Sequence, residues 1–280
     1  MPIDCNVEIV PMEQEQFHAV DKVVMRHVFD LHNTIGRFAN ERIYQEELAR
    51  RCRANGLAVE REVLLRVSHK DFSKSYFLDM LIERGGLYEL KAVEALNGAH
   101  DKQVINYLLL SELRHGKLVN MRPSSVESRF VSTSLSRKDR AEFRLMNEGF
   151  EEASGTDRSF RETLSALLTE WGAFLDVALY RGALLHFFDH PNGGIQPVEI
   201  VVSGQVVGVQ KMCALDDGTA WHLSAILNHY PSYETHLFRL FRHTRLRRLH
   251  WVNFNQREVT LRTLKNDSAV NDSAELKRMT

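Results

Sequence analysis

Two short stretches of the sequence place two carboxylates and a lysine where they could act together. In YELKAV, residues 88–93, Glu89 and Lys91 alternate with apolar residues. Alternate side chains of a strand point to the same face, so these two charges would share a face. Asp79 ends the stretch YFLD, and the turn signal ERGG between the two stretches predicts a hairpin. An isolated Glu-x-Lys is commonly a surface ion pair, so its meaning depends on its surroundings.

Together these three side chains would suit hydrolysis of a phosphodiester with a divalent metal ion. Two carboxylates that converge on one point repel each other, and a hard cation that takes oxygen ligands from both relieves that repulsion. A lysine beside them can orient a water molecule or stabilise charge on a pentacovalent phosphate. We therefore expect Asp79 and Glu89 to bind Mg²⁺ or Mn²⁺, and Lys91 to position the attacking water.

The elements that would position these residues follow one another in the order of an α/β fold. Apolar residues recur at helical spacing from about residue 17 to 33, and a second helical stretch covers about 37 to 54. Three strand-like runs follow, and then a helix near residues 101–113 and two more strands. The strand-like runs are LAVEREVLLRV, YFLDMLI, LYELKAV, KLVNM and RFVST. This order predicts an αβββαβ core.

Composition and charge exclude several classes of protein. The 280 residues carry a formal net charge of −1, so any contact with nucleic acid must come from local clusters of basic residues. The sequence lacks an apolar run long enough for a membrane span, and its acidic N-terminus does not resemble a secretory signal, so we expect a cytoplasmic protein without membrane contact. Cys5, Cys52 and Cys213 are spaced irregularly, which favours reduced thiols.

Short internal matches indicate that the chain contains one unit twice. GRFANERIY from residue 36 matches GAFLDVALY from residue 172 in its Gly, Phe and Tyr, and YELKAV matches WHLSAI from residue 221. LVNMRPSSVESRFVST from residue 118 resembles WVNFNQREVTLRT from residue 251. The matches predict a first lobe at 1–140, a connector with some helix at 141–158, a second lobe at 159–265 and a flexible tail at 266–280.

Six motifs of the first half occur in an order that resembles a known family. They are ERIYQEEL after Gly36, LAVEREV, FLDMLIE, LYELKAV, QVINYL and GKLVNM. Through them, roughly residues 25–135 resemble the GxxExxY family of the PD-(D/E)XK nuclease superfamily. The resemblance implies that Asp79, Glu89 and Lys91 form the nuclease triad. It also implies that the main-chain carbonyl of Leu90 joins the metal ligands.

The resemblance assigns roles to three further residues and contains one departure. Glu41 would complete the metal shell or hold a second ion, and Gln103 and Tyr107 match the Q-x-x-x-Y pattern of RecB-like nucleases. Considered without the family, Glu41 could equally be a solvated helix carboxylate, and the other two could be a polar edge of the core. Phe38 stands where the first Gly of the family pattern is expected, which affects the backbone before Glu41 rather than the metal site.

The second lobe has lost every charged position of the predicted site. The repeat aligns Asp79 with Met212, Glu89 with His222, Lys91 with Ser224, Gln103 with His236 and Glu41 with Val177. This lobe instead contains HLFRLFRHTRLRRLHW, whose interleaved basic and aromatic residues suit phosphate contact and base stacking. A solvated face or a subunit contact explains these arginines equally well. They are Arg239, Arg242, Arg245, Arg247 and Arg248.

Two functions from different classes follow from these patterns. The first is a Mg²⁺- or Mn²⁺-dependent nuclease whose first lobe is active and whose second lobe is a degenerate copy that holds nucleic acid, with DNA favoured over RNA. The alternative is a binding or scaffold protein without turnover in a DNA repair or defence assembly. A homo-oligomer or a protein partner is compatible with both. The three retained triad residues of the first lobe favour the nuclease.

Overall fold

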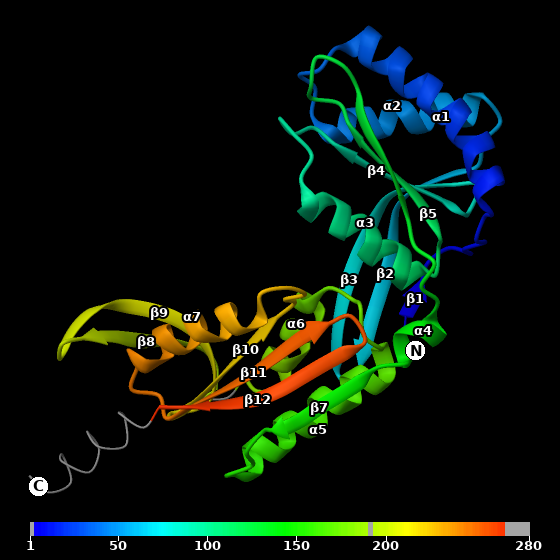
Figure 1. Cartoon of the computed structure of the whole chain (residues 1–280). Coiled ribbons are helices and arrows are strands. Elements are labelled where there is room, and N and C mark those ends of the chain that lie inside the picture. The colour runs from blue at the N-terminus through cyan, green and yellow to red at the C-terminus, as the bar shows by residue number, and fades with distance from the viewer. Residues whose placement is uncertain (1–2, 190–192, 267–280) are drawn as a thin grey trace, which may run out of the picture. The chain divides into compact units, whose positions relative to one another are not determined.

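The chain contains two six-stranded mixed sheets, and each sheet is the centre of its own unit (Figure 1). The computed structural model describes residues 3–189 and 193–266. Unit 1 is Met1–Asp139 and unit 2 is Arg140–Thr280. Helices and strands alternate in both units, which confirms the predicted α/β class. Among the described helices, none combines the length and the apolar character that a membrane crossing requires.

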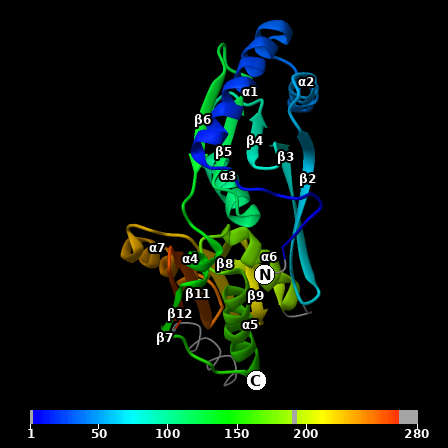
Figure 2. The ribbon, with the colours of Figure 1, turned by 90° about the vertical axis from the view of Figure 1, so that its right-hand side faces the viewer.

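In unit 1 the strands are arranged in the order β1-β2-β3-β4-β5-β6. β4 and β5 are parallel, and α3 provides the crossover between them that parallel neighbours need. The remaining neighbours are antiparallel, and β2 and β3 form a long hairpin (Figures 1 and 2). The elements are β1 (Ile3–Cys5), α1 (Gln14–Ile35), α2 (Glu41–Ala54), β2 (Val59–His69), β3 (Phe72–Ile82), β4 (Gly86–Lys91), α3 (Gly98–Ser111), β5 (His115–Asn120) and β6 (Glu127–Ser132).

The two faces of the central strand β4 meet different helices. Tyr88 and Leu90 belong to the core cluster formed with the apolar stripes of α1 and α2. Because side chains alternate along a strand, Glu89 and Lys91 point to the opposite face. Gly116 on the neighbouring strand β5 packs closely under Val104 of α3 on that face. β4 therefore holds an apolar row against α1 and α2, and a charged row on the side of α3.

Unit 2 has the strand order β7-β12-β11-β10-β9-β8, with β10 and β11 parallel and joined through α7. Its helices α5 and α6 follow the edge strand β7 and precede the other strands, as α1 and α2 follow β1 in unit 1. The short helix α4 (Arg137–Ala141) crosses the boundary between the units. The other elements are β7 (Arg144–Gly149), α5 (Gly155–Trp171), α6 (Val177–Phe187), β8 (Gly194–Val202), β9 (Gln205–Asp216), β10 (Thr219–Ser224), α7 (Tyr230–Arg242), β11 (Arg248–Asn255) and β12 (Glu258–Lys265).

Strand pairing in the two units follows the same register with a constant offset in residue number. Met80 pairs with Tyr88 in unit 1, and Cys213 pairs with Trp221 in unit 2. The parallel strands and the final hairpins repeat this correspondence. The pairs are Lys91 with Asn120 and Ser224 with Asn253 in the parallel strands, and Lys117 with Phe130 and His250 with Thr263 in the hairpins.

The helical parts of the two units share a clasp between a glycine and a tyrosine. The Tyr44 hydroxyl donates to the carbonyl of Gly36 at 2.8 Å, and the Tyr180 hydroxyl donates to the carbonyl of Gly172. Both glycines end a helix with φ near 80° and ψ near −160°. This backbone conformation is essentially restricted to glycine. The clasp places α2, and with it Glu41, at a fixed distance from the end of α1.

The segment between the predicted lobes is more structured than a connector. Residues 141–158 include β7, which pairs in parallel with β12 at the edge of the sheet, and the first turn of α5. β7 has one half-buried residue and is otherwise exposed, so it lacks the apolar alternation by which a strand is recognised. Asn266, the first residue of the predicted tail, is buried and donates to the carbonyl of Thr244 at 3.0 Å. The rest of that tail lies outside the described residues.

The glycine conformation leads to a stability prediction. Gly36→Ala should destabilise unit 1 by about 1–3 kcal/mol, because a side chain makes this backbone conformation costly. Gly172→Ala should cost more, because its Cβ would also lie 2.6 Å from the carbonyl oxygen of Arg140. Gly98→Ala is the control, since its Cβ would meet no atom within 4 Å in the first turn of α3. Urea unfolding of the three variants measures the differences, and equal stabilities for all three would contradict the assignment.

Candidate active site

Asp79, Glu89 and Lys91 lie together where β3 and β4 separate. The paired part of these strands ends at Met80 and Tyr88. Beyond this point a side chain replaces the main-chain acceptor: Asp79 Oδ2 accepts a hydrogen bond from the main-chain N–H of Leu90 at 2.8 Å. On the next strand position, Lys91 Nζ donates to Glu89 Oε1 at 2.6 Å. The two carboxylates and the ammonium group therefore share one face of the sheet, the face toward α3.

Burial makes this group unusual. The Glu89 side chain is 1% exposed and the Lys91 side chain is 14% exposed. Glu89 Oε1 is satisfied by Lys91, but the buried Oε2 has no hydrogen-bond partner within the described residues. An unpaired buried carboxylate oxygen is costly in a sheet centre. Within the described residues, the arrangement therefore leaves Glu89 Oε2 as an acceptor without a donor.

The surroundings of both carboxyl groups oppose ionisation. The pKa of Glu89 is raised to about 8. Burial is the main cause, the charge of Asp79 adds to it, and Lys91 partly opposes the rise. Burial likewise raises the pKa of Asp79 to about 6, and the Leu90 amide and Lys91 oppose that shift. Without a further positive charge, the pair thus retains protons at pH values where isolated carboxylates have lost them.

Two more carboxylates contribute to the electrostatics of this group. Glu41, at the first position of α2, raises the pKa of both Asp79 and Glu89. Glu62 raises the pKa of Asp79 and was not predicted from the sequence. It lies on β2 with φ of 51°, between the pairs Arg61–Met80 and Val63–Leu78, and this unshifted register places it opposite Asp79. Residues opposite each other in an antiparallel pair point to the same face of the sheet, so Glu62 shares the face of Asp79.

The donor set fits a hard divalent cation. Carboxylate oxygens are the ligands that Mg²⁺ and Mn²⁺ prefer, and the unpartnered Glu89 Oε2 provides one at the centre of the group. In the described part of the chain, no three side chains of His, Cys, Asp or Glu converge closely enough to enclose a metal ion by themselves. Glu41 acts on the pair through its charge and makes no contact with it. A bound ion would therefore need other oxygens to complete its shell, such as water or main-chain carbonyls.

Gln103 and Tyr107 of α3 lie beside the same charged row. Gln103 Nε2 donates to the Tyr107 hydroxyl at 3.0 Å. Burial raises the pKa of Tyr107, and the charges of Glu89 and Asp79 act in the same direction. The crossover helix therefore brings a neutral phenol to the group formed by β3 and β4.

A comparison with known families addresses the first part of the chain only. Residues 18–131 match the family model of the PD-(D/E)XK nuclease superfamily. The matched segment lies within unit 1 and contains β3, β4 and α3 with all of the residues described above. No curated protein matches the chain. This match suggests nuclease activity for unit 1.

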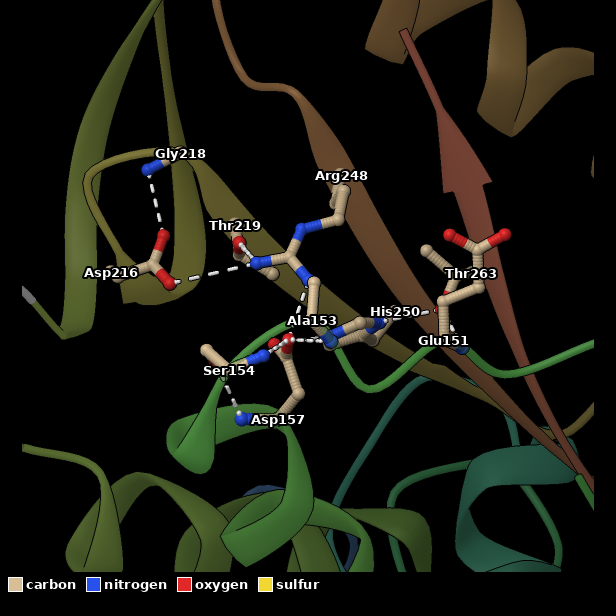
Figure 3. Close-up of polar contacts among 10 residues, drawn as sticks. All are labelled: Glu151, Ala153, Ser154, Asp157, Asp216, Gly218, Thr219, Arg248, His250 and Thr263. Atoms are coloured by element: carbon tan, nitrogen blue, oxygen red, sulfur yellow. Dashed lines mark hydrogen bonds and ion pairs between the residues drawn. The ribbon is translucent and has the colours of Figure 1, made fainter.

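The five arginines of unit 2 are not one surface. Arg248 is bound internally, because its guanidinium donates to Asp157 and to the Thr219 hydroxyl (Figure 3). Asp157 is fully buried and also contacts His250, whose other ring nitrogen meets Thr263. Arg247 lines a surface pocket of about 500 Å³ with Asp216. The remaining arginines are exposed on α7 or just after it: Arg239, Arg242 and Arg245.

Unit 2 has no carboxylate at the positions that correspond to Asp79 and Glu89. His222 occupies the place of Glu89, and its Nε2 lies 2.7 Å from the Tyr233 hydroxyl. Burial, assisted by the charge of Arg181, lowers the pKa of His222 to about 4, so the ring is neutral at pH 7. Ser224, in the place of Lys91, donates to Asn253. The two carboxylates and the lysine of unit 1 therefore have no counterpart at this position of unit 2.

Burial of Glu89 leads to a pH prediction. A carboxyl whose pKa is raised on folding favours the folded state at low pH, and this contribution is lost as pH rises through the window from 4.5 to about 8. In EDTA, the wild type should lose stability between pH 5 and pH 8, and Glu89→Gln should lose less. Each loss of about 1 kcal/mol in the free energy of unfolding should lower Tm by about 2–4 °C.

Glu60→Gln, an exposed carboxyl on β2, serves as the matched control for this measurement. It should follow the wild type at both pH values. The interpretation of a strained buried carboxylate would be wrong if Glu89→Gln were as pH-sensitive as the wild type or less stable than it at pH 8.

Proposed function

We propose that unit 1 is a divalent-metal-dependent nuclease of the GxxExxY type that hydrolyses phosphodiester bonds of DNA or RNA in the cytoplasm. The observation that carries this proposal is the buried group of Asp79, Glu89 and Lys91, with one carboxylate oxygen left without a partner. The match of residues 18–131 to the nuclease superfamily supports it. The enclosed Glu89 is difficult to explain as a structural ion pair, since its removal from water costs more than one contact with Lys91 returns.

The proposed metal ligands are the carboxylates of Asp79 and Glu89 and the main-chain carbonyl of Leu90, with Glu41 completing the shell or holding a second ion. When bound, Mg²⁺ or Mn²⁺ supplies Lewis-acid stabilisation of charge on the phosphate and a more acidic water. The chain prepares the site by fixing the two carboxylates. Asp79 is held by the Leu90 amide, and Glu89 is held by Lys91.

Lys91 is suited to act as a fixed positive charge. Burial alone lowers its pKa, but the charges of Glu89, Asp79 and Glu41 outweigh this effect and raise it. The ammonium group therefore remains protonated and cannot serve as a general base. It can orient a water through its N–H groups and stabilise negative charge on the phosphate. Gln103 and Tyr107, on α3, are proposed to position the substrate or this water.

We also infer that the two units arose by tandem duplication and that unit 2 is the degenerate copy. The same order of elements, the same strand register and the glycine–tyrosine clasp support the inference. A further correspondence is an amide that closes the loop after each central strand. Asn120 bonds both the N–H and the C=O of Val93, and Asn253 does the same with Ile226.

A catalytically silent binding or scaffold protein is the second candidate. It is favoured by the loss of every carboxylate at the corresponding site of unit 2, since a chain can keep this fold without its chemistry. Both candidates bind nucleic acid, and a homo-oligomer or a protein partner from DNA repair or defence is compatible with each. Cleavage by the pure protein distinguishes them.

The nuclease proposal predicts that metal and catalysis depend on the same group. Mg²⁺ should stabilise the wild type by mass action, by about 2.7 kcal/mol at a hundredfold excess over Kd, and so raise its Tm; Asp79→Asn should blunt this rise. Lys91→Ala should remain folded and lose at least about a hundredfold in cleavage of DNA or RNA. Lys102→Ala, an exposed lysine on α3, is the control and should cleave normally.

Two results would count against this assignment. If the wild type and Asp79→Asn respond alike to Mg²⁺, these carboxylates do not hold the metal. If folded Lys91→Ala protein cleaves as fast as the Lys102→Ala control, the lysine has no role in the reaction.

The exposed arginines predict a contribution of unit 2 to nucleic-acid binding. Arg239→Ala, Arg242→Ala and Arg245→Ala together should weaken binding to mixed-sequence DNA and RNA and reduce the slope of log K against log salt by about 2–3 for duplex DNA. Binding titrations at several salt concentrations measure both effects. Unchanged affinity and slope would assign these arginines to packing or self-association instead.

A further inference from the structure

The position in unit 2 that corresponds to the proposed metal site contains a cation of its own. Arg181 of α6 directs its guanidinium to β10, where Nη2 donates to the main-chain carbonyl of Leu223 at 3.3 Å. Tyr180 and Tyr44 make the same clasp, so Arg181 corresponds to the buried Gln45 of unit 1. Leu223 corresponds to Leu90, since each directly precedes the residue of the matching parallel pair, Ser224 with Asn253 and Lys91 with Asn120. The guanidinium thus binds the Leu223 carbonyl, whose counterpart in unit 1, the Leu90 carbonyl, is proposed to bind a metal ion.

The neighbours of Arg181 do not neutralise its charge. Its field lowers the pKa of His222 in addition to burial, and it opposes the rise that burial causes in the pKa values of Tyr233 and Cys213. These three side chains carry no negative charge at pH 7. Among the described residues, no carboxylate lies within ion-pair distance of Arg181. The site is therefore positive where the corresponding site of unit 1 is negative.

Arg248, in the same unit, is an example of an arginine with a structural role. Its side chain is 17% exposed, and it pairs with the buried Asp157 and with Thr219. Arg181 differs in both respects, because it is exposed and has one main-chain contact. A guanidinium has five N–H donors in a planar fork that matches phosphate oxygens, so most of the donors of Arg181 are available to a ligand.

We propose that Arg181, with the Leu223 carbonyl fixing its guanidinium beside His222 and Tyr233, forms a metal-independent binding site for a phosphodiester of nucleic acid. The choice of nucleic acid as the ligand rests on the proposed function of unit 1. The site itself rests on the contacts within unit 2. Binding there leads to no cleavage, because unit 2 has neither carboxylates nor a lysine at the corresponding positions. Corresponding sites would thus cleave nucleic acid in unit 1 and bind it without cleavage in unit 2.

The test is binding by the full-length protein in EDTA, where the metal-dependent reaction of unit 1 cannot occur. Labelled mixed-sequence DNA and RNA oligonucleotides are titrated by fluorescence anisotropy at several salt concentrations. Arg181→Ala should raise Kd about tenfold and reduce the salt slope by about one. Arg181→Lys should recover part of the affinity, because it keeps the charge and loses the fork. Arg144→Ala, an exposed arginine on β7 of the same unit, should change Kd by less than about twofold.

Thermal unfolding separates a binding role from a purely structural one. Loss of a structural contact would lower Tm and leave Kd and the salt slope of the folded protein unchanged, and this result would overturn the proposal. Equal losses for Arg181→Ala and Arg144→Ala would also overturn it, because binding would then be unspecific attraction. If Arg181→Ala does not fold, the comparison of Arg181→Lys with the wild type decides in the same way.

The outcome is independent of the nuclease test. A protein that binds through Arg181 in EDTA and never cleaves would keep this site and lose the proposed function of unit 1. A protein that cleaves with Mg²⁺ and binds equally well without Arg181 would keep the nuclease and lose this site. Absence of any oligonucleotide binding in EDTA by the wild type would also overturn the proposal.

Discussion

The hydrogen bond from the Leu90 amide to the Asp79 carboxylate is the contact on which the organisation of unit 1 depends. It forms where the ladder of β3 and β4 stops, so a side chain takes the place of a main-chain acceptor. This substitution brings Asp79 beside Glu89 in the interior of the sheet, where each charge makes the other more costly. The strand order, the crossover helix α3 and the packing of α1 and α2 all serve to hold that unfavourable pair in place.

Much of this arrangement could be predicted from the sequence, because its signals are local. Alternation along β4 places Glu89 and Lys91 on one face, and the hairpin signal before it places Asp79 across from them. The elements of unit 1 have strong apolar periodicity, and the core helices and strands appear where that periodicity predicts. β7 was missed because it is an exposed edge strand, and its pairing with β12 depends on residues more than a hundred positions away.

The remaining differences involve contacts that no local pattern reveals. Arg248 was grouped with the other arginines of its stretch, yet its partner Asp157 lies on a helix 91 positions earlier. The sequence of α6 likewise gives no indication that Arg181 reaches the carbonyl of Leu223, 42 positions later. Glu62 lies opposite Asp79 because of the register of β2 against β3, and the sequence does not reveal that register. Each case depends on tertiary placement and not on residue type or spacing.

Helix α1 of unit 1 and helix α5 of unit 2 each contain an acid that pairs with the sheet, half-buried in α1 and fully buried in α5. Asp21 of α1 binds Lys117 of β5 at 2.9 Å, and Asp157 of α5 binds His250 of β11 at 2.9 Å. Breaking such a pair typically costs about 3–5 kcal/mol, because one charge then remains buried alone. Both units thus contain this pairing between helix and sheet, whereas the two carboxylates of the candidate site occur in unit 1 and not at the corresponding positions of unit 2.

The glycine–tyrosine clasp has a consequence for recognising relatives of this fold. A glycine that ends the first helix, and a tyrosine eight positions later whose hydroxyl returns to its carbonyl, occur in both units. The clasp is built from main-chain geometry and one phenol, so it carries no information about catalysis. A search pattern based on it would find copies whose carboxylates have been replaced, which patterns built on the catalytic residues overlook.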